Sequence, residues 1–107
     1  MSTDPTAIKS GRIILVAQVE ALQEKVTAVA SHLKAIQARA LSPEEPGCYT
    51  YRVVQYETKF LVFEEYENVE AFKHHENGAP FQTFAADLSN LIVGPGANID
   101  IGFYSEI

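Results

Sequence analysis

The sequence has no tryptophan and only one cysteine, Cys48, among its 107 residues. A single thiol cannot form a disulfide within the chain, and no group of Cys and His residues has the spacing of a zinc finger. These shortages exclude a disulfide-linked secreted scaffold and a structural zinc domain. We therefore expect no bound metal and a location in the reducing cytoplasm.

Basic residues are scarce as well: 8 Lys and Arg stand against 14 Asp and Glu, for a formal net charge of −6. An acidic surface is poorly suited to phosphate backbones or anionic lipid, so the chain is not expected to bind nucleic acid or a membrane. Long apolar runs are also missing. The longest covers residues 13–17, far fewer than the roughly 20 residues of a transmembrane helix.

What the sequence does contain is a share of 47% hydrophobic residues, arranged in short periodic segments. This share is typical of globular proteins, and the length is sufficient for one hydrophobic core. We expect residues 1–10 to form a flexible N-terminal tail and residues 11–107 to form a single domain.

The first half of the chain predicts three strands and one helix. Residues 12–20 are apolar on both alternating faces, which indicates a strand that is covered on both sides. Residues 23–41 carry an apolar stripe at helical spacing. Residues 48–56 and 59–66 are two β-rich runs separated by a short polar turn, as in an antiparallel hairpin.

The second half predicts a broken helix and a last strand. Asn68 can cap a helix that ends at Asn77, and Pro80 suits the first turn of a second helix whose apolar stripe reaches residue 92. Residues 93–98 are expected to form a loop, and residues 99–104 alternate as a strand.

This order predicts an α+β fold, the ferredoxin-like βαββαβ arrangement with a four-stranded antiparallel sheet. Right-handed crossovers place both helical segments on the same side of the sheet. The other face would expose a sheet-sized apolar surface, larger than monomers usually leave in water. We therefore expect a homodimer that packs two sheets face to face as a dimeric α+β barrel, with a pocket between sheet and helices in each subunit.

Two adjacent histidines lie at the rim of this predicted pocket. His75 follows Ala71 by four positions and Phe72 by three, so it is expected to point inward while His74 points outward. A neutral imidazole there could accept a proton from a phenol or an enol. The alternative is a structural histidine that is hydrogen-bonded at the edge of the domain.

Glu64 is the second candidate, because it shares a strand face with Phe60, Val62 and Tyr66. A carboxyl group among such neighbours must pair, accept hydrogen bonds or become protonated, so it could orient the histidine or handle a proton. The alternative is an ion pair with Arg52 of the neighbouring strand.

Three segments carry a family resemblance: EPGCYTYRV at residues 45–53, the run from FLVFEEY to FAADL at residues 60–88, and VGP at residues 93–95. They resemble the antibiotic biosynthesis monooxygenase domain family, which consists of small dimeric ferredoxin-like α+β barrel proteins. The resemblance extends over residues 13–104.

The resemblance implies an oxygenase that acts with O2 on polycyclic phenols or quinols, often without metal or flavin. By position, His75 matches the pocket histidine of the family and Glu64 its third-strand acid. Tyr66 stands where many members have Trp, and Pro80 replaces a second histidine. The haem-degrading relatives are a poorer match, because Ala85 aligns with their iron-ligating histidine and this chain has no tryptophan.

We therefore expect a cofactor-independent monooxygenase that oxidises an electron-rich aromatic, phenol or quinol, with O2 and this small ligand as its partners. The alternative is a non-catalytic dimeric module of the same fold that binds a small ligand. His75 and Glu64 are the expected catalytic residues. The expected pocket is aromatic and comprises Tyr51, Tyr66, Phe72, Phe81 and Phe84.

Overall fold

The structure is a computed structural model that describes residues 11–94 and 99–107. The predicted tail at residues 1–10 and part of the predicted loop at residues 93–98 lie outside the described residues. The elements, in chain order, are β1 (Ile13–Glu20), the 3-10 helix η2 (Gln23–Lys25), α1 (Val26–Ala40), β2 (Cys48–Tyr56), β3 (Lys59–Tyr66), α2 (Val69–Glu76), α3 (Ala79–Ala86), α4 (Leu88–Leu91) and β4 (Asp100–Ser105).

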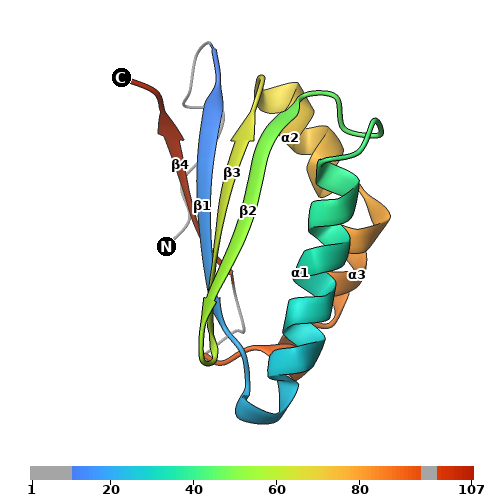
Figure 1. The fold of residues 1–107 in the computed structure, drawn as a ribbon, viewed down its shortest axis with the longest axis vertical. Coiled ribbons are helices and arrows are strands. Elements are labelled where there is room, and N and C mark those ends of the chain that lie inside the picture. Colours follow the sequence, from blue (N-terminus) through green and yellow to red (C-terminus); the bar gives the residue numbers. More distant parts are fainter. Residues whose placement is uncertain (1–10, 95–98) are drawn as a thin grey trace.

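The four strands form one sheet in the order β2-β3-β1-β4, and every neighbouring pair is antiparallel. The helices α1, α2 and α3 all lie on one side of this sheet (Figure 1). The predicted α+β ferredoxin-like fold is therefore confirmed, including the placement of the helical segments on a single face. The strands β2 and β3 have the bounds that the sequence predicted.

The helical segment between β3 and β4 has one more break than predicted. Asn68 caps α2 as expected, since its Oδ1 accepts a hydrogen bond from the Ala71 backbone N–H at 2.9 Å. The second helix is interrupted at Asp87: α3 ends at Ala86, and the short α4 covers Leu88–Leu91, close to the predicted end. At this break the Asp87 carboxylate accepts a 2.6 Å hydrogen bond from the Asn90 side chain.

The hydrophobic core fills the space between the sheet and the helices. Val29, Leu33 and Ile36 of α1 are buried and belong to the same cluster as Val62 and Tyr66 of β3. Within the described part of the chain, no helix is long and apolar enough to cross a membrane.

Candidate functional site

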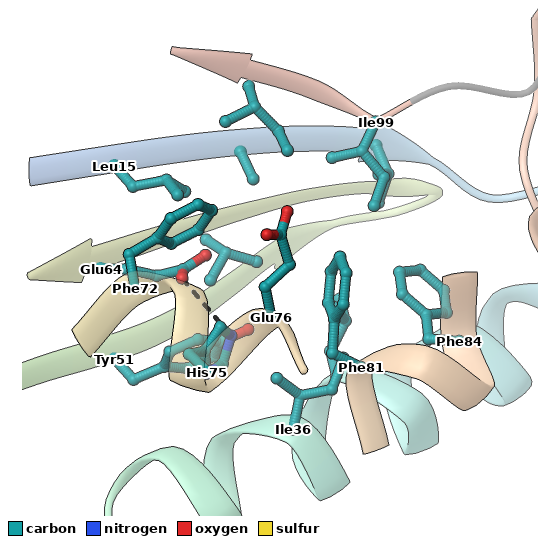
Figure 2. Close-up of a pocket in the computed structure, with 15 residues that line it drawn as sticks. Leu15, Ile36, Tyr51, Glu64, Phe72, His75, Glu76, Phe81, Phe84 and Ile99 are labelled. Atoms are coloured by element: carbon teal, nitrogen blue, oxygen red, sulfur yellow. Dashed lines mark ion pairs between the residues drawn. The ribbon is translucent and has the colours of Figure 1, made fainter. Parts of the chain in front are cut away.

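A small apolar cavity lies between the sheet and the helices, and the space inside it that the centre of a water molecule can reach is about 40 Å³. Its walls come from all four strands and from α1, α2 and α3, and Figure 2 shows the side chains that line it. Four of the five predicted pocket aromatics line it, namely Tyr51, Phe72, Phe81 and Phe84, together with His75 and Glu64. Tyr66 does not line the cavity and lies behind Glu64.

The two adjacent histidines point in opposite directions. His75 is buried at the end of α2, where its ring packs 5.5 Å from Tyr51, 5.3 Å from Tyr66 and 6.1 Å from Phe81, centroid to centroid. His74 is exposed, and its Nε2 lies 2.7 Å from the backbone oxygen of Glu44. The helical spacing correctly predicted which histidine faces inward.

His75 has a buried carboxylate partner that the sequence did not reveal. Its Nδ1 lies 2.7 Å from Oε1 of Glu45, and Oε2 of Glu45 accepts a 2.6 Å hydrogen bond from the guanidinium of Arg39. Because the ionised carboxylate only accepts hydrogen bonds, this network assigns the ring proton to Nδ1. The Nε2 atom of His75 is then an unprotonated acceptor.

Burial keeps this imidazole neutral. The low-polarity surroundings lower the pKa of His75 below its ordinary value of 6.5, although the nearby charge of Glu45 acts in the opposite direction. A neutral histidine with a free Nε2 is the form that can accept a proton at pH 7.

Glu64 faces the same histidine from the sheet. Its Oε1 accepts a 2.5 Å hydrogen bond from the Tyr66 hydroxyl and lies 3.7 Å from Nε2 of His75 (Figure 2). Burial, with a further contribution from the charge of Glu45, raises the pKa of Glu64 to about 8 despite the Tyr66 hydrogen bond. The carboxyl group is therefore mostly protonated at pH 7.

The alternative pairing of Glu64 with Arg52 is wrong. Arg52 stands opposite Phe63 in the β2–β3 ladder, and it is Tyr51 that stands opposite Glu64. Because side chains alternate between faces, Arg52 lies on the face away from the helices, where it is exposed.

The single cysteine, Cys48, is half-buried, and its Sγ lies 3.6 Å from the backbone oxygen of Thr50. Burial raises the pKa of the Cys48 thiol to about 12, with the nearby charge of Glu45 as a smaller contribution. A thiol with this pKa stays protonated and is a poor nucleophile.

Sequence reasoning missed Arg39, Glu45 and Glu76. The first two belong to α1 and to the turn after it, and periodicity does not tell which of Glu44 and Glu45 turns inward. Glu76 projects from the end of α2 across the cavity, between Phe72 and Phe81 (Figure 2). Among the described residues that line the cavity, Glu76 is the only exposed acid.

The fold and the side chains at the cavity define a class of protein. It is a ferredoxin-like domain in which the buried His75 and the carboxyl groups of Glu64 and Glu76 border an apolar cavity. The model of the family described as "Antibiotic biosynthesis monooxygenase" matches residues 12–87. The chain therefore belongs to the antibiotic biosynthesis monooxygenase family.

Solved structures of low sequence identity share the fold. A Pseudomonas aeruginosa protein is 23% identical with a TM-score of 0.80, covering 92% of this chain and 96% of its own. A Caulobacter crescentus protein, provisionally named an antibiotic biosynthesis monooxygenase, is also 23% identical with a TM-score of 0.79, covering 92% of both chains. A Mycobacterium tuberculosis protein is 16% identical with a TM-score of 0.79, covering 90% of this chain and 95% of its own. No curated protein matches the sequence.

Proposed function

We propose that this protein is a cofactor-independent monooxygenase that oxidises an electron-rich phenol or quinol with O2. The observation that supports this most is the unprotonated Nε2 of His75, buried at the wall of an apolar cavity. Membership of the monooxygenase family and the provisional name of the Caulobacter crescentus protein point to the same chemistry.

The proposed reaction begins with proton removal. Nε2 of His75 takes the hydroxyl proton, and the resulting phenolate is electron-rich enough at its para carbon to reduce O2 itself. A C–O bond forms there to give a peroxide, which takes up a proton. Loss of the para C–H proton and cleavage of the O–O bond then give a quinone and one molecule of water, so that one phenol and one O2 are consumed.

The protein would contribute base, acid and exclusion of water. A positioned base is worth roughly 10²–10⁴-fold in typical enzymes. Glu64, protonated at neutral pH, would give the peroxide its proton. Exclusion of water from the apolar cavity would keep the carbon nucleophile from being protonated by solvent.

The cavity must widen to accept an aromatic ring. The centre of a water molecule reaches only about 40 Å³ of it, a small space for a ligand the size of a naphthol. The exposed Glu76 and the half-buried Phe81 are the lining residues whose side chains can move without opening the core.

We further propose that two copies pair through the helix-free faces of their sheets. This face exposes Val54, Tyr56, Phe63 and Tyr104, a concentration of apolar and aromatic side chains that a second copy would cover. A cytoplasmic location, where the free Cys48 thiol stays reduced, is part of the same proposal.

Oxygen uptake by the purified, metal-free protein tests the function against a panel of naphthols and quinols. The sharpest variant is His75→Asn, because the Asn amide can still donate to Glu45 while it offers no base. We expect at least a 100-fold loss of turnover with His75→Asn and no loss with the matched control His74→Asn. Equal turnover in both variants would show that His75 is not the base.

Ligand binding without oxygen uptake would favour the alternative, a non-catalytic module. In that case a naphthol would raise the melting temperature of the wild type, since binding to the folded state stabilises it, while O2 consumption stayed at the background rate.

A further inference from the structure

We infer that Glu45, held in place by Arg39, is a positioning residue that fixes the tautomer of His75 and so keeps its Nε2 lone pair free toward the cavity. The inference rests on the proposed function, because it specifies how the same histidine is prepared as a base. Nothing in the family match or in the names of the similar structures assigns a role to either residue.

The contacts of Glu45 with Arg39 and His75 hold its carboxylate in a single orientation. Oε2 accepts from the Arg39 guanidinium at 2.6 Å, and Oε1 lies 2.7 Å from Nδ1 of His75. Arginine has donors only, so Oε2 must accept, and the remaining oxygen is left for the imidazole. All three side chains are largely shielded from water.

Two glycines let the backbone approach closely enough for this arrangement. A Cβ on Gly47, two residues after Glu45, would lie 2.6 Å from Cβ of Ala71 on α2, which is closer than atoms can pack. A Cβ on Gly78 would lie 2.1 Å from the Arg39 guanidinium. The loop that carries Glu45 thus packs directly against α2, and the turn after His75 packs against the Arg39 guanidinium.

Several charged or titratable groups face His75, and they shift its pKa in opposite directions. Glu45 from the α1–β2 loop and Glu76 on its own helix favour the protonated ring, while burial and the charge of Arg39 disfavour it. Glu64 approaches Nε2 from β3, and its pKa of about 8 leaves it mostly uncharged at pH 7. The hydroxyls of Tyr51 and Tyr66 stay neutral, because burial raises the pKa of both. The Cys48 thiol stays neutral for the same reason.

The variant Glu45→Gln tests the inference. Glutamine has nearly the same shape as glutamate, but one of the two accepting carboxylate oxygens is replaced by a donating NH2 group. The guanidinium of Arg39 requires the amide oxygen, which turns the amide NH2 toward Nδ1 of His75. Nδ1 must then accept, and the ring proton moves to Nε2. We expect ¹⁵N NMR of the imidazole to show the Nδ1–H tautomer in the wild type and the Nε2–H tautomer in Glu45→Gln.

A double variant separates this role from a merely structural one. In Arg39→Met combined with Glu45→Gln, no guanidinium holds the amide oxygen, so the amide can rotate and accept from Nδ1–H. Both tautomers are then allowed, so the Nδ1–H tautomer should return in part. The single variant Arg39→Met should keep this tautomer and raise the pKa of His75, since a positive charge that opposes protonation is gone.

Glu44→Gln is the matched control, because Glu44 is the neighbouring acid, is exposed and lies 3.9 Å from Nε of Arg39. It should change neither the tautomer nor the rate. With an accepted quinol, Glu45→Gln should lose turnover about 10²–10³-fold, within the range of a lost base, and the double variant should recover part of it.

The tautomer measurement needs no substrate, so it is independent of the proposed function. A folded Glu45→Gln protein that keeps the Nδ1–H tautomer would overturn the inference even if the wild type proved to be an oxygenase. Conversely, an inverted tautomer in a protein that consumes no O2 would support the inference and remove the proposed function. If Glu45→Gln does not fold, a lowered His75 pKa in Arg39→Met would overturn the inference, and a raised one with the Nδ1–H tautomer intact would support it.

Discussion

The two faces of the sheet are built from similar side chains, yet only one of them lies under helices. On strand β3, Phe60 faces the helices and is 3% exposed, whereas Phe63 faces away and is 37% exposed. On the neighbouring strand β2, Tyr51 is buried and Tyr56 is 74% exposed. The position of a residue in the strand alternation thus decides whether it belongs to the core or to the bare surface.

The same alternation gives two adjacent glutamates different chemistry. Glu64 faces the helices, where burial raises its pKa to about 8 and places it beside His75. Glu65 faces the other way, accepts a hydrogen bond from Thr50 and pairs with the exposed Arg12 at 2.5 Å. The raised pKa of the carboxyl group therefore depends on which face of the sheet is covered, and not on the residue type.

The largest expected difference between the faces is in stability. Phe60→Ala should lower the free energy of unfolding by about 3–5 kcal/mol, because a large buried side chain leaves a cavity. Phe63→Ala, the same change three residues later, should cost the isolated subunit about 1 kcal/mol or less. Urea unfolding at low protein concentration measures both values. Equal losses would mean that the bare face is also part of the core of a single chain.

A second test addresses what covers the bare face. If two copies pair there, Phe63→Glu places an unpaired charge in the interface and should weaken dimerisation by about 100-fold or more, which corresponds to about 3 kcal/mol. Sedimentation equilibrium measures the dissociation constant. Lys73→Glu, an exposed position on α2, is the control and should leave association unchanged. A wild type that sediments as a monomer at micromolar concentration would contradict the pairing.

The sequence was sufficient for the fold and for half of the site. Strand alternation and helical spacing are local, so they correctly placed Glu64 on the covered face and His75 inward. The partner of His75 is not local, since Glu45 lies 30 residues earlier in the chain. Its approach depends on how the α1–β2 loop packs against α2 at Gly47, a tertiary contact with no periodic signal.

The smallest of the three expected effects is a pH dependence of folding stability, which Glu64 should cause and Glu65 should not. Burial raises the pKa of Glu64 from 4.5 to about 8, so the folded state holds a proton that the unfolded state has lost. This contribution is fully present below about pH 4.5 and is lost as the pH rises through about 8. Between pH 6.5 and 8.5 the wild type should therefore lose about 2 kcal/mol of stability by linkage. His75, whose pKa is lowered, contributes only below pH 6.5.

Glu64→Gln should remove this slope, because the amide does not titrate and can still accept the hydrogen bond from Tyr66. Glu65→Gln on the bare face should leave the slope unchanged. It loses only an ion pair to an exposed arginine, worth about 0.5 kcal/mol and weaker in high salt. Urea unfolding of the three proteins at four or five pH values distinguishes them. An unchanged slope in Glu64→Gln would mean that Glu64 is already ionised at neutral pH, and Glu64 would then have no proton to give to a peroxide.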